Sequence, residues 1–210
     1  MLRALSCSGL MAWLLLILAP LLVPPDQIVR LTPQVSEESS WSPDGRRLVC
    51  DSNRAGKTTS LFVMDADGGN VAQLTRGPGS DETPAWSPDG KRFAYVSDRS
   101  GHAEIWLVDA DGKNPRQLTR HGGEAIHPHW SPDGRRVIYC AGREKPEQYE
   151  IADGTGPQQL VELPGRCTSP KWSPDGKWIS FDRALERSCE ILRVPAPPTP
   201  APAFPGPTQG

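Results

Sequence analysis

Short apolar runs, separated by residues of the turn-forming type, recur along this chain. Residues 91–97 show the pattern best, because Phe93 and Tyr95 fall on one face of an extended strand and Ala94 and Val96 fall on the other. Comparable runs lie at residues 61–64, 104–109 and 190–194. Runs of this length, bounded by Gly, Pro, Asp and Ser, predict short buried β-strands.

The sequence Trp-Ser-Pro-Asp-Gly precedes four of these runs. It begins at Trp41, Trp86, Trp130 and Trp172, at intervals of 45, 44 and 42 residues. Ser-Pro-Asp-Gly fits a type I turn, because Pro fixes φ at the second position and Gly supplies a positive φ at the end. We therefore assign a structural turn motif to Trp41, Pro43, Asp44, Gly45, Trp86, Pro88, Asp89, Gly90, Trp130, Pro132, Asp133, Gly134, Trp172, Pro174, Asp175 and Gly176.

Each repeat holds four predicted strands. In the second repeat they lie at residues 81–86, 91–97, 104–109 and 115–119. A sheet that is apolar on both faces must pack against a neighbour on each side, and a period in the forties is typical of such blades. The sequence thus predicts an all-β fold: a β-propeller of four blades, each a four-stranded antiparallel sheet.

The two ends of the repeat array complement each other. The fourth copy runs through its third strand, residues 190–194, and then meets Pro195, which cannot donate to a sheet ladder. A spare strand-like segment, residues 27–32, precedes the first copy. We predict that this N-terminal strand closes the last blade. The alternative is that a four-copy chain forms half of an eight-bladed dimer.

Three segments are expected from the changes in composition. Residues 1–25 combine an early positive charge with an apolar stretch from Gly9 to Val23, which predicts a signal peptide or an uncleaved N-terminal anchor. Residues 26–194 form the propeller. Residues 195–210 contain seven prolines and predict a disordered tail. The expected location is therefore periplasmic or secreted.

The net charge of −2 provides no basic field for nucleic acid, so no nucleic-acid partner is expected. Contact with a membrane is expected only through the N-terminal segment.

Beyond residue 25 the chain has four cysteines. Cys50 and Cys140 lie on strands of opposite blades and are interpreted as small buried apolar residues. Cys167 and Cys189 lie on loops that open on the same side of the fourth blade, which predicts a disulfide between them.

One cluster has metal-ligand chemistry: His121, Glu124, His127 and His129. His127 and His129 are two residues apart on a predicted strand, so their side chains should point the same way, and imidazole is a common ligand of zinc and copper. The competing interpretation is that these are solvated histidines at the rim of the third blade. We favour that interpretation and predict neither a metal nor a cofactor.

The repeat resembles that of TolB-type β-propellers, a WD-repeat-like family of exported bacterial proteins. The resemblance rests on the four turns, the Ser-Asp-Arg segment at residues 97–99, the Asp-Ala-Asp-Gly turns at 65 and 109, and the Leu-Thr strands. It covers residues 27–194. It implies binding of envelope proteins, such as peptidoglycan-associated lipoproteins, through a face of the ring.

The predicted function is therefore that of a non-catalytic protein-binding propeller of the cell envelope, whose partner is an envelope protein or lipoprotein. No nucleophile with a partner base and no phosphate-binding loop stands out from the turn-forming residues, so no enzyme activity is predicted. The alternative is a metal-dependent propeller enzyme, of the polysaccharide lyase or hydrolase type, that uses His127 and His129.

Overall fold

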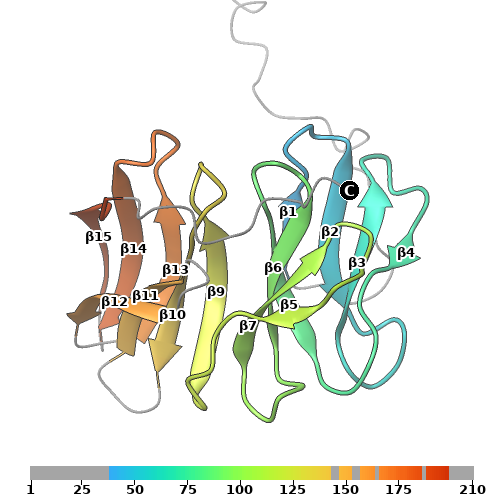
Figure 1. Ribbon diagram of the computed structural model, residues 1–210, viewed down its shortest axis with the longest axis horizontal. Coiled ribbons are helices and arrows are strands. Elements are labelled where there is room, and N and C mark those ends of the chain that lie inside the picture. Colours follow the sequence, from blue (N-terminus) through green and yellow to red (C-terminus); the bar gives the residue numbers. More distant parts are fainter. Residues whose placement is uncertain (1–37, 143–146, 153–156, 164–165, 186–187, 199–210) are drawn as a thin grey trace, which may run out of the picture. The chain divides into compact units, whose positions relative to one another are not determined.

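The computed structural model describes residues 38–142, 147–152, 157–163, 166–185 and 188–198, all within a compact unit that spans Gln34–Gly210. These residues form fifteen strands in four antiparallel sheets, in agreement with the predicted all-β class (Figure 1). The predicted N-terminal segment 1–25, the predicted closing strand 27–32 and most of the tail lie outside the described residues. Within the described part, no helix is long and apolar enough to span a bilayer.

The first three sheets each have four strands, joined in chain order by antiparallel pairing. The first sheet contains β1 (Ser39–Trp41), β2 (Arg47–Ser52), β3 (Ser60–Asp65) and β4 (Ala72–Gln73). The second contains β5 (Asp81–Trp86), β6 (Arg92–Ser97), β7 (Glu104–Asp109) and β8 (Arg116–Gln117). The third contains β9 (Glu124–Trp130), β10 (Val137–Gly142), β11 (Glu147–Ala152) and β12 (Pro157–Leu163).

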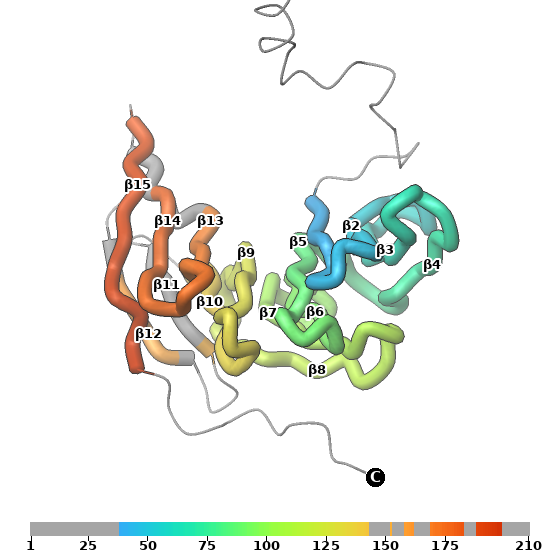
Figure 2. The backbone as a smooth tube through the Cα atoms, turned by 90° about the horizontal axis from the view of Figure 1, so that it is seen from above, coloured from blue at the N-terminus to red at the C-terminus, as the bar shows by residue number. Residues whose placement is uncertain are grey.

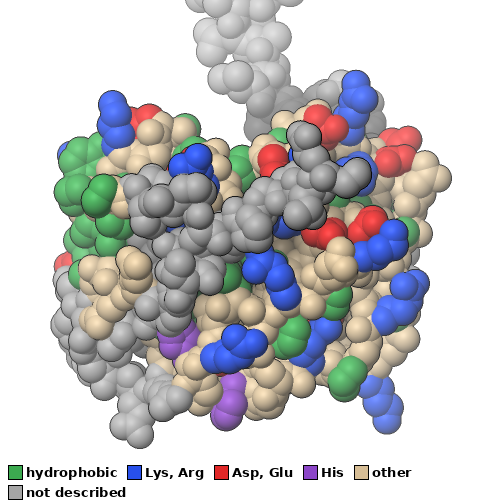
Figure 3. Space-filling view, in the orientation of Figure 1, with side chains coloured by type: hydrophobic (Ala, Val, Ile, Leu, Met, Phe, Trp, Pro, Cys, Tyr) green, Lys and Arg blue, Asp and Glu red, His purple; other side chains and the backbone are tan. Residues whose placement is uncertain are grey.

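The fourth sheet has three described strands: β13 (Arg166–Trp172), β14 (Trp178–Leu185) and β15 (Ser188–Pro195). Among the described residues, β15 pairs only with β14. One face of this sheet carries Trp178 and Ile191, which are 38% and 79% exposed. Hydrophobic side chains gather at this end of the molecule in Figure 3. The closure predicted for this blade concerns residues 27–32 and is not tested by the described strands.

A bulge interrupts the first strand of the second, third and fourth sheets. The residue three positions before the Trp has a positive φ in each case: 48° at Thr83, 54° at His127 and 45° at Ser169. The register shifts at the same places, so that two residues oppose one on the neighbouring strand. Alternation along these strands therefore does not follow the simple two-residue period that the sequence suggests.

Buried side chains fill the space between consecutive sheets, which Figure 2 shows following one another in chain order. We call the three contacts the first, second and third sheet interface. The first is built around Val49, Leu61, Phe93 and Tyr95, the second around Ala94, Ile105, Trp130 and Tyr139, and the third around Ile138, Trp172, Ile179 and Phe181. The second and third sheets bury apolar side chains on both faces because each contacts two neighbouring sheets.

The same Trp-centred contact recurs at all three interfaces. A guanidinium of one sheet lies over the turn Trp of the next: Arg47 over Trp86 at 5.0 Å, Arg92 over Trp130 at 5.5 Å and Arg136 over Trp172 at 4.5 Å from the ring centroid. The three covered Trp residues are 4–7% exposed, whereas Trp41, which precedes these interfaces, is 54% exposed. Cation–π contact thus accompanies the burial of apolar surface at each interface.

Candidate functional site

The four Trp-Ser-Pro-Asp-Gly turns are built alike. In the first, the N–H of Gly45 donates to the carbonyl of Ser42 at 2.9 Å, and the Ser42 hydroxyl donates to Asp44 at 2.6 Å. The matching hydroxyl–carboxylate distances in the other turns are 2.6, 2.5 and 2.6 Å. The Ser and Asp side chains of the four motifs are therefore hydrogen-bonded to each other inside their own turns.

These hydrogen bonds also fix the charge of the turn carboxylates. The Ser42 hydroxyl and the backbone N–H of Arg46 lower the pKa of Asp44. At Asp133, burial opposes ionisation, but the hydrogen bond from Ser131 and the backbone N–H of Arg135 outweigh it, so the pKa is again lowered. Such carboxylates remain ionised and do not act as proton donors near neutral pH.

The histidines of the predicted cluster do not share one site. The bulge places Ile126 opposite Cys140 and His129 opposite Ile138, so His129 lies on the Ile126 face and His127 falls within the bulge between them. His129 accepts a hydrogen bond through Nδ1 from the backbone N–H of Trp172 at 3.3 Å. The prediction that His127 and His129 point the same way is wrong because the strand bulges between Ile126 and His129.

His121 is also used inside the fold. Its Nε2 lies 3.0 Å from the hydroxyl of Tyr139 on β10.

Burial, and then the nearby Lys171, lower the pKa of His129, which keeps that imidazole neutral. Among the described residues, no group of three or more His, Cys, Asp or Glu side chains is placed to hold a metal.

The structure contradicts the predicted Cys167–Cys189 disulfide. Cys189 has a free, exposed thiol, whereas Cys140, interpreted from the sequence as a small apolar residue, forms a disulfide. Strands β13 and β15 both pair with β14, on opposite sides of it, with Cys167 beside Arg183 and Cys189 beside Ala184. Two strand spacings, about 9.5 Å, separate the two backbones, and a disulfide tolerates at most about 7 Å between Cα atoms.

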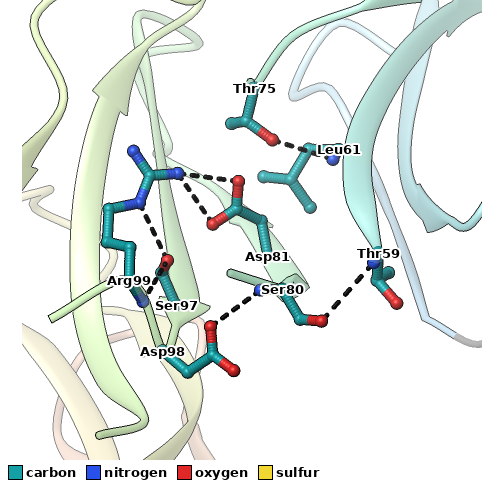
Figure 4. A network of polar contacts seen from close by, with 8 residues as sticks. All are labelled: Thr59, Leu61, Thr75, Ser80, Asp81, Ser97, Asp98 and Arg99. Atoms are coloured by element: carbon teal, nitrogen blue, oxygen red, sulfur yellow. Dashed lines mark hydrogen bonds and ion pairs between the residues drawn. The ribbon is translucent and has the colours of Figure 1, made fainter. Parts of the chain in front are cut away.

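A buried ion pair stands at the first sheet interface. The Nη2 of Arg99 donates to both carboxylate oxygens of Asp81, at 2.8 and 2.7 Å, and its Nε donates to the Ser97 hydroxyl at 2.9 Å (Figure 4). The two charged side chains are only 15% and 4% exposed. The guanidinium also lies over the Trp106 ring at 5.1 Å. Arg99 is therefore held in one orientation from three sides.

A pocket of about 150 Å³ lies beside this ion pair. Its polar wall is formed by Thr75, Arg76, Tyr95 and Arg99, and its other lining residues are Leu74, Val108, Gly112 and Pro115. Arg76 and Pro115 are exposed, so the pocket reaches the surface. All its polar side chains can donate hydrogen bonds, and none is a carboxylate or an imidazole.

Tyr95 is the unusual member of this wall. It is fully buried, and its hydroxyl has no hydrogen-bond partner. Burial raises the pKa of Tyr95, with Arg99 opposing and Asp81 supporting the shift, so the group stays a neutral hydroxyl. A buried donor without an acceptor is costly and uncommon in folded proteins. Tyr95, one of the residues that line the pocket, therefore carries a hydroxyl that the fold itself does not satisfy.

This pocket was not predicted from the sequence. The ion-paired residues are 18 positions apart, and the turn-like Ser-Asp-Arg segment gave no sign that its Arg faces a carboxylate on the preceding strand. A comparison of repeats could have found the pocket, since Gly77 stands where the next repeat, 44 residues later, has His121. The φ of 124° at Gly77 is one that side-chain-bearing residues rarely adopt.

Four antiparallel sheets, packed face to face through a repeated turn, define the chain as a β-propeller protein. The family model of the TolB beta propeller domain, PD40, matches residues 26–154. The chain therefore belongs to the TolB β-propeller family.

Solved structures agree with this assignment. A putative TolB from Agrobacterium tumefaciens is 28% identical, with a TM-score of 0.69, covering 78% of this chain and 59% of that one. TolB from Acinetobacter baumannii is 22% identical, with a TM-score of 0.65, covering 80% and 41% of the two chains. The chain thus spans less than two thirds of either structure. No curated protein sequence matches it significantly.

A propeller enzyme is also similar in fold. An oligogalacturonate lyase, solved in complex with manganese, is 18% identical with a TM-score of 0.58, covering 73% of this chain and 48% of its own. At this identity the likeness concerns the fold alone, which supports many unrelated functions.

Proposed function

We propose that this protein is a non-catalytic protein-binding β-propeller of the cell envelope, located in the periplasm or secreted, whose partner is an envelope protein or lipoprotein. The observation that carries the proposal is the polar wall of the pocket at the first interface. Its side chains donate hydrogen bonds or carry positive charge, and the carboxylate that contacts this wall, Asp81, is already paired with Arg99. Such a wall is suited to holding an acceptor group rather than to moving a proton.

Membership of the TolB β-propeller family supports the envelope assignment, as does the apolar segment within residues 1–25. The alternative of a metal-dependent lyase or hydrolase rests on His127 and His129. The bulge and the hydrogen bond to the backbone of Trp172 give those two histidines separate surroundings, so no observation on the described residues favours it.

Crosslinking in intact cells, followed by identification of the captured proteins, tests the proposal. We expect an envelope lipoprotein or an outer-membrane protein to be captured, equally by the wild type and by a variant with His127→Ala and His129→Ala. The proposal is overturned if no such protein is captured and the purified chain cleaves acidic oligosaccharides when a divalent metal is added. Loss of that cleavage in the double variant would identify the enzyme site.

A further inference from the structure

The first and second sheet interfaces contain the same pair of hydroxyl groups. Thr75 and Tyr95 stand at the first interface, and Thr119 and Tyr139 stand 44 residues later at the second. Both threonines accept a hydrogen bond from a backbone N–H, that of Leu61 at 3.0 Å and that of Ile105 at 2.9 Å. At both interfaces the Thr hydroxyl oxygen accepts this hydrogen bond, so the hydroxyl proton is still available for donation to another group.

At the second interface the protein supplies partners for both hydroxyls. The Thr119 hydroxyl donates to Oε2 of Glu104 at 2.5 Å, and the Tyr139 hydroxyl lies 3.0 Å from Nε2 of His121. Oε1 of Glu104 also accepts from the N–H of Gly122 at 2.8 Å, and this Glu is only 2% exposed. A buried carboxylate and an imidazole thus occupy this interface.

At the first interface both partners are replaced. Ser60 stands at the position of Glu104, as the register shows, since Ser52 opposes Ser60 and Ser97 opposes Glu104. Gly77 stands at the position of His121. Consequently, among the described residues Thr75 makes no counterpart of the Thr119–Glu104 hydrogen bond, the Tyr95 hydroxyl has no partner, and the 150 Å³ pocket is lined by both side chains.

The charged residues that line the pocket are both arginines. Arg76 is exposed at its mouth and Arg99 is fixed in its wall, while the charge of Arg99 is shared with Asp81. A carboxylate can accept hydrogen bonds at both oxygens and is favoured beside a guanidinium. The empty volume is several times that of one water molecule, about 30 Å³. It therefore has room for the end of an acidic side chain.

We propose that the pocket between the first and second sheets binds an Asp or Glu side chain of the partner protein, whose carboxylate accepts hydrogen bonds from Tyr95 and Thr75 next to Arg76 and Arg99. The inference rests on the proposed protein-binding function, which it deepens. The partner would supply the acceptors that Glu104 and His121 supply one repeat later. It would also satisfy the donor that this protein leaves buried.

A titration of the full chain with glutamate blocked at both ends (N-acetyl, N-methylamide), followed by NMR, tests the site. We expect shifts of the Arg99 Nε–H and of the amides around Thr75, and no comparable shifts with blocked glutamine. Tyr95→Phe should weaken binding about tenfold, the effect of losing a hydrogen bond to a charged group. Tyr139→Phe and Arg120→Glu are the matched controls from the next repeat and should leave binding unchanged.

Arg76→Glu gives a second variant that changes only an exposed residue, so its fold is expected to be intact. It should also weaken the binding of blocked glutamate. Equal binding of blocked glutamate and glutamine, or equal affinity in Tyr95→Phe and Tyr139→Phe, would overturn the proposed site. The crosslinking experiment in cells distinguishes failure of the proposed pocket from failure of the proposed protein-binding function. Undiminished capture of an envelope protein by Arg76→Glu would leave the binding function standing and reject the pocket as its contact.

Discussion

The first and second sheet interfaces use the same turn, the same Arg–Trp contact and the same Thr and Tyr positions, yet they differ in what lies between those hydroxyls. The second is filled by Glu104 and His121. The first has Ser60 and Gly77 at the equivalent positions, a buried ion pair beside them, and a pocket. The same turn, Arg–Trp contact and hydroxyl positions are therefore compatible both with an interface filled by polar partners and with one that has a pocket.

We expect the ion pair to make the largest energetic difference between the two interfaces, since Ala125 occupies in the third repeat the position of Asp81. We expect Asp81→Ala to lower the free energy of unfolding by about 3–5 kcal/mol, because it leaves the buried guanidinium of Arg99 without its partner. Urea denaturation measures this loss. The control is Asp111→Ala, which breaks the exposed pair with Lys113 and should barely change the midpoint. Similar losses in both variants would contradict the assigned role of burial.

Glu104 should be the most sensitive polar residue of the second interface. Glu104→Gln replaces one acceptor oxygen by a donor that faces Thr119 or Gly122, and the expected loss is about 1–3 kcal/mol. The same measurement on Ser60→Ala, the equivalent position of the first interface, should give a smaller loss. If both substitutions have the same effect, the two interfaces do not differ in the way described.

The two tyrosines should respond differently to loss of the hydroxyl. Tyr139→Phe removes the partner of His121 and should cost about 0.5–1.5 kcal/mol. Tyr95→Phe removes a buried hydroxyl that has no partner, so stability should be unchanged or increased. Thermal denaturation of the two variants side by side measures the difference. A larger loss in Tyr95→Phe would show that its hydroxyl is satisfied in the free protein.

The third interface adds a pH dependence through His129. Burial and Lys171 lower its folded pKa, so the folded state binds fewer protons than the unfolded state, whose value is about 6.5. The stabilising contribution is therefore present above about pH 6.5, and it is lost as the pH falls through the folded pKa. His129→Asn keeps an acceptor but removes the titration, so its stability relative to the wild type should rise on acidification. His102→Asn, a change at an exposed histidine, should show no such trend.

The repeated part of the fold could be predicted from the sequence, because turn chemistry and apolar runs are local. The turns at Trp41 and Trp86 and the strands between them follow from residue types within a few positions. The bulge at His127 could not be predicted, since an extra residue in one strand is visible only when its partner strand is in place. That bulge invalidated the expected alignment of His127 with His129.

The cysteine prediction failed for a related reason. The prediction assumed that Cys167 and Cys189 lie on two loops at one side of the blade. In the structure the two cysteines lie on strands β13 and β15, and β14 lies between those strands. The pocket was missed because its unusual feature is the absence, at Ser60 and Gly77, of the carboxylate and imidazole that Glu104 and His121 supply in the next repeat. Absent partners become apparent only after the repeats are superposed.

Binding of blocked glutamate to Ser60→Glu tests the central claim most directly. This substitution gives the first interface the carboxylate that Glu104 supplies at the second, where it accepts the hydroxyl proton of the repeat's Thr. The account predicts that Ser60→Glu is folded and no longer binds blocked glutamate. A folded Ser60→Glu protein that still binds it with wild-type affinity would contradict the account.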